Sequence, residues 1–272
     1  MRIYKFGGAS VKDANGVKNL ITILNTLGSE KTLIVVSAMG KTTNSLELVV
    51  KNYFDNKEEL QYSINEVFTF HNKILNDLFN DNKHKIFSDV KEILENLRIF
   101  LKRNKSPDYS FVYDQVVIFG EILSTKIINS YLIHSNIRCN WLDARTLIKT
   151  DSKYRDANLN WEITKNSISN GVNTKLLNIT QGFIASDSNN FSTTLGREGS
   201  DYTAAIFAYC LNAESVTIWK DVPGVLNADP RVFKKPQLLN KISYTEAIEL
   251  AFYGASVIHP KTLQPLQKKE IP

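Results

Sequence analysis

The sequence predicts an α/β protein, a three-layer α/β/α sandwich around a mainly parallel central sheet. Residues 32–38 form an unbroken apolar run of strand length, which is typical of a strand covered on both faces. Strand-like runs alternate with segments of helical spacing, the order expected of α/β proteins. In addition, two glycine turns each precede a helical pattern, one near each end of the chain.

The first glycine turn follows the first predicted strand, residues 3–6. Gly7 and Gly8 form the turn, and apolar residues then recur at helical spacing over residues 17–27. Adjacent glycines let backbone amides approach a phosphate closely, and Lys5 just before them offers a point charge. A glycine pair after a strand is more often a plain turn, so this signal alone is weak.

Further elements follow in order along the chain. The helical patterns at residues 60–78 and 86–101 predict an antiparallel pair laid over the sheet edge, with His71 as a core residue. More strands are predicted by the apolar runs listed here: residues 32–38, 116–119, 177–184 and 215–219.

The second glycine turn lies within residues 194–205, TLGREGSDYTAA. It combines a cation with two carboxylates and continues directly into an apolar helical pattern. The N-terminus of a helix carries free backbone amides and a positive dipole end, which suits an anion. Asp201 there is either a helix-capping residue or part of a site, and its place beside Arg197 favours a site.

Composition excludes several classes of protein. The 272 residues carry a formal net charge of +5 with scattered basic residues, so we expect no nucleic-acid partner. The N-terminus lacks the apolar core of a signal peptide, and no apolar run approaches the length of a membrane span. Cys139 and Cys210 are far apart and fit two reduced thiols. These features indicate a cytoplasmic protein.

One segment imitates a different phosphate-binding motif. Gly40-Lys41-Thr42 looks like the end of a Walker A loop, but Val35 stands where that motif needs its first glycine. We therefore exclude a P-loop nucleotidase and expect Lys41 to be an exposed loop residue.

Four segments together resemble the aspartate kinases. They are KFGGASV at residues 5–11, GREGSDYTAA at residues 196–205, WKDVPGV at residues 219–225 continuing to Asp229-Pro230-Arg231, and Glu246-Ala247 continuing to GASVIHP at residues 254–260. The segments keep the family's order and spacing over the whole chain. This resemblance implies an amino-acid-kinase fold and transfer of the ATP γ-phosphoryl group to the β-carboxylate of L-aspartate, the first step toward lysine, threonine and methionine.

The resemblance also implies a domain organisation. Residues 1–272 would form one catalytic domain, cut before its last strand, with the regulatory domains of the family outside these residues; an unusually short natural protein is the alternative. The family is commonly dimeric through those further domains, so a homo-oligomer is expected of the longer chain. ATP and Mg²⁺ are the expected cofactors, and no protein metal site is expected.

The resemblance assigns roles to individual residues. Lys5 and Asp201 are the expected catalytic residues. The expected aspartate-binding residues are Ser37, Thr43, Asn44, Glu121 and Arg197. The expected nucleotide-binding residues are Lys5, Gly7, Gly8, Ser10, Ser200, Lys220, Asp221, Val225, Arg231 and Lys261.

The chemistry agrees with these roles. A free aspartate side chain has a pKa of about 3.9, so the nucleophile is already ionised and needs no general base. Phosphoryl transfer then depends on positioning and electrostatic stabilisation. Arg197 offers a two-pronged partner for the α-carboxylate, and Glu121, expected at a strand end, suits the α-ammonium.

Three positions depart from the family pattern. Ala9 replaces a threonine, Glu198 replaces a glycine beside Arg197, and Ser256 replaces a lysine that usually contacts nucleotide phosphates. Lys261 is the expected substitute for that lysine. These changes bear on nucleotide affinity more than on the reaction.

Two alternatives stay open at this point. One is a related enzyme of the same fold acting on glutamate, carbamate or a nucleotide. The other is a catalytically silent ligand-sensing protein, favoured by the missing lysine at position 256.

Overall fold

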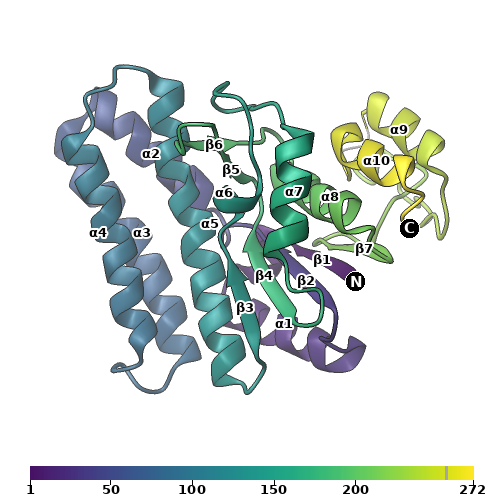
Figure 1. Cartoon of the computed structure of the whole chain (residues 1–272), viewed down its shortest axis with the longest axis horizontal. Coiled ribbons are helices and arrows are strands. Elements are labelled where there is room, and N and C mark those ends of the chain that lie inside the picture. Colours follow the sequence, from purple (N-terminus) through teal and green to yellow (C-terminus); the bar gives the residue numbers. More distant parts are fainter. Residues whose placement is uncertain (255–256) are drawn as a thin grey trace.

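The computed structural model describes residues 1–254 and 257–272 and has three layers (Figure 1). Its centre is a parallel five-stranded sheet with the order β3-β4-β2-β1-β7. The strands are β1 (Arg2–Phe6), β2 (Thr32–Val36), β3 (Cys139–Leu142), β4 (Leu177–Gln181) and β7 (Ser215–Trp219). The predicted fold class, a sandwich with a mainly parallel sheet, is confirmed.

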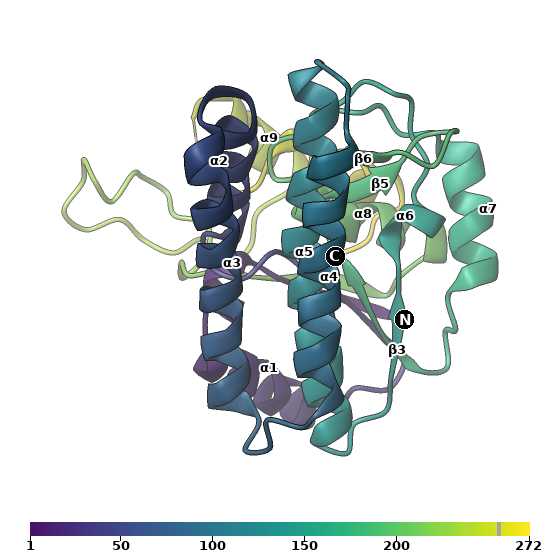
Figure 2. The same ribbon diagram turned by 90° about the vertical axis from the view of Figure 1, so that its left-hand side faces the viewer.

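Helices cover both faces of the sheet (Figures 1 and 2). A short 3₁₀ turn, η1 (Gly8–Val11), comes before α1. The helices are α1 (Ala14–Leu27), α2 (Thr42–Asp55), α3 (Lys57–Leu78), α4 (Lys85–Arg103), α5 (Tyr109–His134), α6 (Ala144–Leu147), α7 (Trp161–Gly171), α8 (Gly199–Leu211), α9 (Tyr244–Phe252) and α10 (Pro260–Lys268). A two-stranded antiparallel hairpin, β5 (Ile184–Ser186) with β6 (Ser192–Thr194), lies beside the sheet.

Side-chain alternation along β1 divides the core into two halves. Tyr4 and Phe6 pack into the larger core with α1, α3, α4 and α5, whereas Ile3 packs into a second core with α8. Because successive strand residues point to opposite faces, Lys5 shares the α8 face with Ile3. The strand period therefore aims one buried lysine at the start of α8.

α5 corrects one strand prediction. Residues 116–119 lie inside this 26-residue helix, and its buried residues lie on all sides of it. A helix that is apolar all round has no amphipathic period, so a short stretch of it reads like a buried strand. By length and composition α5 is also apolar enough to cross a membrane, contrary to our expectation of no such run, but 67% of its most apolar stretch is buried inside the protein.

The helical pair α3 and α4 forms as predicted but in a different place. Both helices pack against other helices, α3 on α1 and α2 and α4 on α5, so they form an outer layer (Figure 2). We had predicted that they cover the sheet edge. His71 of α3 is fully buried, as expected, and burial lowers its pKa to about 4.

The strand predicted over residues 177–184 is broken. β4 ends at Gln181, Gly182 and Phe183 turn the chain, and β5 begins at Ile184. Phe183 has a φ of 71°, a left-handed conformation that ends a strand. The edge strand β3 was missed because only four half-buried residues form it.

A buried carboxylate joins α5 to β6. Asp114 accepts hydrogen bonds from the Thr194 amide at 2.9 Å, the Thr194 hydroxyl at 2.8 Å and the Arg155 amide at 2.9 Å. Burial nevertheless raises its pKa to about 6. Asp114 thus fixes the end of β6, two residues before the Gly196 turn.

Replacing Asp114 tests this anchor. Asp114→Ala leaves buried donors without an acceptor, so we expect the free energy of unfolding to fall by about 2–4 kcal/mol. Chemical denaturation measures it, and exposed Asp77→Ala in α3 is the matched control, expected to stay within about 0.5 kcal/mol of wild type. An Asp114→Ala protein as stable as the control would contradict this role.

Candidate active site

The two glycine turns meet at the carboxyl end of the sheet. The Lys5 ammonium of β1 lies 2.6 Å from Asp201 Oδ1 in the first turn of α8. Both side chains are almost fully buried, with 7% and 2% exposed. Residues 196 positions apart in sequence therefore form one ion pair.

Lys220 joins this pair from the neighbouring strand. It directly follows β7, which pairs in parallel with β1, so both lysines stand at the same sheet edge. The Lys220 ammonium lies 2.9 Å from Asp201 Oδ2 and 3.7 Å from Glu198 Oε1. Asp201 thus holds two ammonium groups side by side. These two cations can bind a polyanion when their ion pairs with Asp201 are partly replaced by contacts to it.

Glu121 also belongs to this region, although the prediction placed it at a strand end. It lies in the middle of α5 and is 3% exposed. Burial raises its pKa to about 8, against the opposing effects of the Lys5 charge and the Ala38 amide. The site therefore contains a buried carboxyl group with one oxygen, Oε2, that has no hydrogen-bond partner among the described residues.

The first glycine turn lies tightly against the loop after β2. The Gly40 amide donates to the Gly8 carbonyl at 3.0 Å, and the Gly7 amide donates to the Trp219 carbonyl at 3.3 Å. A Cβ at Gly8 would lie 2.7 Å from the Ala38 carbonyl oxygen. Glycine is required at position 8 by this contact between backbones. Ser10 donates its hydroxyl to the Trp219 carbonyl at 3.3 Å.

The second turn is equally close to the sheet. A Cβ at Gly182, just after β4, would lie 2.5 Å from the Ser200 side chain. Ser200, in the first turn of α8, is therefore buried against the end of β4.

The predicted aspartate-binding residues come from three elements. Ser37 follows β2 and accepts a hydrogen bond from the Ser124 hydroxyl of α5 at its carbonyl, at 2.8 Å. Thr43 and Asn44 lie in the first turn of α2. Arg197 is exposed in the second glycine turn, with no ion pair among residues 1–254 and 257–272. Its guanidinium is available to a ligand.

The predicted nucleotide residues divide into two groups. Lys220 and Asp221 line a hollow of about 230 Å³ together with Ser10 and Trp219. Arg231 instead lies on the long loop after β7 that extends away from the body (Figure 2). Arg231 pairs with Asp229 at 2.7 Å, and among the described residues no ion pair joins it to the Lys5 cluster. Val225 lines a small apolar cavity against α9 and α10.

Lys261 has other protein partners. Its ammonium lies 3.1 Å from Asp156 Oδ1 and 3.1 Å from the Leu195 carbonyl oxygen. It is thus beside the second glycine turn but occupied by protein partners. Ser256, the position of the missing lysine, lies outside the described residues. Lys41 is exposed, as expected.

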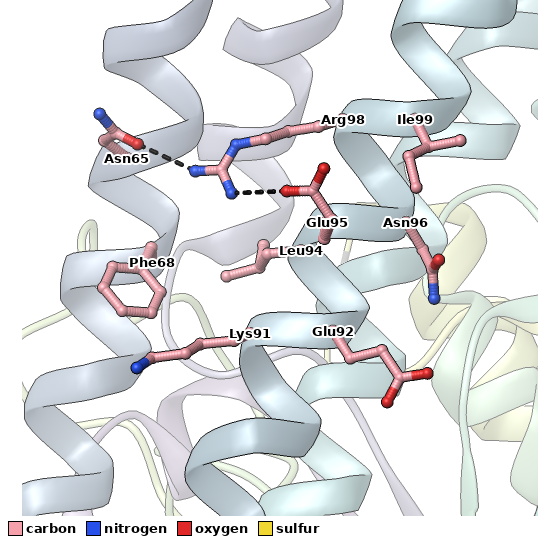
Figure 3. A pocket seen from close by; sticks show the side chains of 9 residues that line it. All are labelled: Asn65, Phe68, Lys91, Glu92, Leu94, Glu95, Asn96, Arg98 and Ile99. Carbon is pink, nitrogen blue, oxygen red and sulfur yellow. Dashed lines mark hydrogen bonds and ion pairs between the residues drawn. The ribbon is translucent and has the colours of Figure 1, made fainter.

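Another hollow lies away from this cluster. A groove of about 660 Å³ runs between α3 and α4, where Arg98 bridges Asn65 and Glu95 (Figure 3). None of the residues that line it belongs to the four sequence motifs. It is a seam between two outer helices, remote in sequence from the charged cluster.

Mg²⁺ fits this site as an ion carried by phosphates. Among residues 1–254 and 257–272 no group of three or more His, Cys, Asp or Glu side chains is arranged to hold a metal. Mg²⁺ usually keeps several waters and takes one or two carboxylates plus substrate phosphates. Asp201 is the carboxylate that lies beside both lysines, so it is the protein oxygen best placed for that ion.

Two contributors were missed by sequence reasoning. Ser124 donates a hydrogen bond to the loop that contains Ser37. It lies three residues after Glu121 on α5, so the two side chains share one face of that helix. The spacing would have indicated Ser124 if residues 116–119 had been predicted as helix. Asp156 contacts Lys261 and lies against Gly196; a Cβ on Gly196 would lie 2.6 Å from its Oδ1. No motif marks Asp156.

Sequence comparison agrees with this geometry: the profile of the amino acid kinase family matches residues 1–272. The chain belongs to the amino acid kinase family. Lysine-sensitive aspartokinase 3 of Escherichia coli is 31% identical to it over 282 residues, which cover 99% of this chain and 60% of the relative. A bifunctional aspartokinase/homoserine dehydrogenase 2 of Arabidopsis thaliana is 31% identical over 99% of this chain and 30% of its own length.

Solved structures lead to the same family. E. coli aspartokinase III in complex with aspartate and ADP superimposes with a TM-score of 0.90 at 30% identity, over 100% of this chain and 60% of that one. The same enzyme with lysine and aspartate gives 0.89. This amino acid kinase chain spans 30% of the length of the A. thaliana relative and 60% of the length of the E. coli relative.

The close approach at Gly8 generates a prediction. Gly8→Ala puts a methyl group against the backbone of the loop after β2, so we expect the free energy of unfolding to fall by about 1–3 kcal/mol. Ala9→Ser, at the exposed neighbouring position, is the matched control and is expected to be neutral. Thermal and chemical denaturation compare the two; equal stability would show that this turn tolerates a side chain.

Proposed function

We propose that the protein is an aspartate kinase, which transfers the ATP γ-phosphoryl group to the β-carboxylate of L-aspartate to give 4-phospho-L-aspartate and ADP. One observation carries the proposal: Lys5 and Asp201, from the two glycine turns, form a buried ion pair 2.6 Å long at the sheet edge. In open α/β sheets, ligands bind at the carboxyl ends of the strands. The relatives described above support the choice of substrate.

Phosphoryl transfer needs cations more than it needs a base. A β-carboxylate oxygen of aspartate attacks the γ-phosphorus, the bond from that phosphorus to the bridging oxygen breaks, and ADP leaves with the electron pair. The Lys5 ammonium offsets the charge of the transferring group, and Lys220 beside it offsets that of the nucleotide phosphates. Asp201 keeps both ammonium groups in place. Mg²⁺, when bound, supplies further charge neutralisation at the phosphates.

The aspartate side of the site is assigned to Glu121, Arg197 and the Ser37 loop. Glu121 is a buried carboxyl near Lys5 with a free oxygen, and an α-ammonium would be its partner. Exposed Arg197 can grip the α-carboxylate through two parallel hydrogen bonds. Thr43 and Asn44, in the first turn of α2, complete this side.

The nucleotide side is assigned to the first glycine turn and the segment after β7. Gly7, Gly8 and Ser10 bring backbone close to Lys220 and Asp221 around the 230 Å³ hollow. Ser200 belongs to the start of α8. Val225, Arg231 and Lys261 are assigned to this side as well, and their contacts in this structure are an apolar cavity for Val225 and carboxylates for Arg231 and Lys261.

The biological setting follows from the same proposal. We assign the reaction to the start of lysine, threonine and methionine synthesis, in the cytoplasm, and expect homo-oligomers of a longer chain that carries regulatory domains. Aspartate is the proposed partner molecule, and neither nucleic acid nor membrane is expected to bind.

Lys5→Ala tests the proposal directly. Loss of one aimed cation costs on the order of 10²–10³ in kcat, measured as aspartyl-hydroxamate formation by the full-length protein. Lys41→Ala, at the exposed lysine of the Walker-like segment, is the matched control and should keep wild-type turnover. Nucleotide binding should survive in both variants.

Three results would overturn the assignment. Wild-type turnover by Lys5→Ala would remove the catalytic role of that lysine. Faster ADP release with L-glutamate than with L-aspartate would indicate another kinase of this family. Nucleotide binding without phosphoryl transfer by the wild-type full-length protein would indicate a silent sensor.

Glu121 gives a second, pH-dependent test. Its pKa of about 8 leaves the carboxyl mostly protonated at neutral pH, and an incoming α-ammonium favours the ionised form. Binding of L-aspartate should therefore release a proton, and affinity should rise between about pH 6 and pH 8 and then level off. Calorimetry in buffers of different ionisation enthalpy measures the number of protons released per bound L-aspartate.

Glu121→Gln provides the comparison. This variant should bind L-aspartate about tenfold to a hundredfold more weakly, with no proton release and with a flat profile over the same pH range. Equal proton release by wild type and variant would show that another group titrates.

A further inference from the structure

Glu198 stands at the entrance of the charged cluster and belongs to neither group of assigned residues. Its Oε2 accepts a hydrogen bond from the His259 amide at 2.9 Å, at the start of α10. Its Oε1 lies 3.7 Å from the Lys220 ammonium. One carboxylate thus pairs with a lysine and with the backbone amide at a helix N-terminus, the two kinds of group that bind phosphates.

The backbone conformation of Glu198 is unusual for its residue type. Its φ of 51° is left-handed, a conformation that favours glycine. Glu198 is the residue before α8, yet its side chain makes no capping hydrogen bond to that helix. The carboxylate instead contacts Lys220 and His259, so it does not cap α8.

Lys220 does not need Glu198 to hold its position. Its ammonium already pairs with Asp201 Oδ2 at 2.9 Å and donates a hydrogen bond to the Val257 carbonyl. Glu198 adds a longer and partly exposed contact, in which 20% of the Lys220 side chain and 28% of the Glu198 side chain are exposed. Its main effect is therefore on charge: the Glu198 carboxylate, like that of Asp201, offsets positive charge of the Lys5 and Lys220 ammonium groups.

We propose that Glu198 is an affinity-setting residue that competes internally with the nucleotide phosphates for Lys220. A bound polyanion and the Glu198 carboxylate cannot both pair favourably with that ammonium, so nucleotide binding has to displace the carboxylate. This inference rests on the proposed function, since it takes Lys220 as a phosphate contact. It gives this chain weaker nucleotide binding than the same site with an uncharged residue at position 198.

The test measures binding of MgATP, ADP and AMP to the full-length protein by calorimetry. Glu198→Gln keeps the shape and removes the charge, so its Kd for MgATP should fall about threefold to tenfold. The increase in affinity should be smaller for ADP and nearly absent for AMP, because these nucleotides carry fewer phosphate charges that compete with Glu198 for Lys220. The gain should also shrink at high salt.

A matched control and a second variant keep the result interpretable. Glu162→Gln changes an exposed glutamate in the first turn of α7 and should leave all three Kd values unchanged. Glu198→Gly suits the left-handed backbone, so it should fold and show the same tighter binding even if Glu198→Gln does not fold. Hydrogen exchange at the His259 amide should be faster in Glu198→Gly, which lacks the acceptor, than in Glu198→Gln, whose side-chain oxygen can still accept that hydrogen bond.

The outcomes separate the two proposals. Unchanged or weaker MgATP binding in both Glu198 variants, or an equal gain for AMP and ATP, would overturn the role of Glu198 while the kinase assignment stands. Absence of any nucleotide binding by the wild-type protein would overturn both. A loss of thermal stability without a change in nucleotide affinity would show that Glu198 is merely structural.

Discussion

The buried contact between Lys5 and Asp201 is the interaction on which the site depends. Taking two charges out of water is costly, and such a pair is poor at adding stability unless its geometry is good. Here the ammonium and the carboxylate lie 2.6 Å apart, and Lys220 supplies a second cation at 2.9 Å. The arrangement is therefore better explained as an anion-binding site than as a contribution to the stability of the fold.

The parallel sheet explains why this contact can form. β1 and β7 are neighbours, so Lys5 near the end of β1 and Lys220 just beyond β7 stand at one edge. Alternation along β1 turns Lys5 toward α8, and the glycines at positions 182 and 199 let that helix approach the ends of the strands. The two glycines and the alternation of side chains along β1 thus bring the Lys5 ammonium and the Asp201 carboxylate together.

The same edge collects a second kind of group. Glu121 comes from α5, and its raised pKa of about 8 reflects burial without a full set of partners. Asp114, on the same helix, has three donors and serves the fold by anchoring β6. Two buried carboxyls on one helix therefore differ in role because one is saturated with hydrogen bonds and the other keeps a free oxygen.

The sequence alone determined the fold class, the strands at residues 3–6, 32–38 (observed as 32–36) and 215–219, and the two glycine turns, because short apolar runs and glycine pairs are local signals. It also named the members of the ion pair from their motifs. Only the tertiary structure decided that residues 116–119 are helix, since a helix buried on all sides loses its period. Likewise, only packing decided that Arg231 pairs with Asp229 on a projecting loop and that Glu198 reaches Lys220. Such contacts join distant parts of the chain and leave no local pattern.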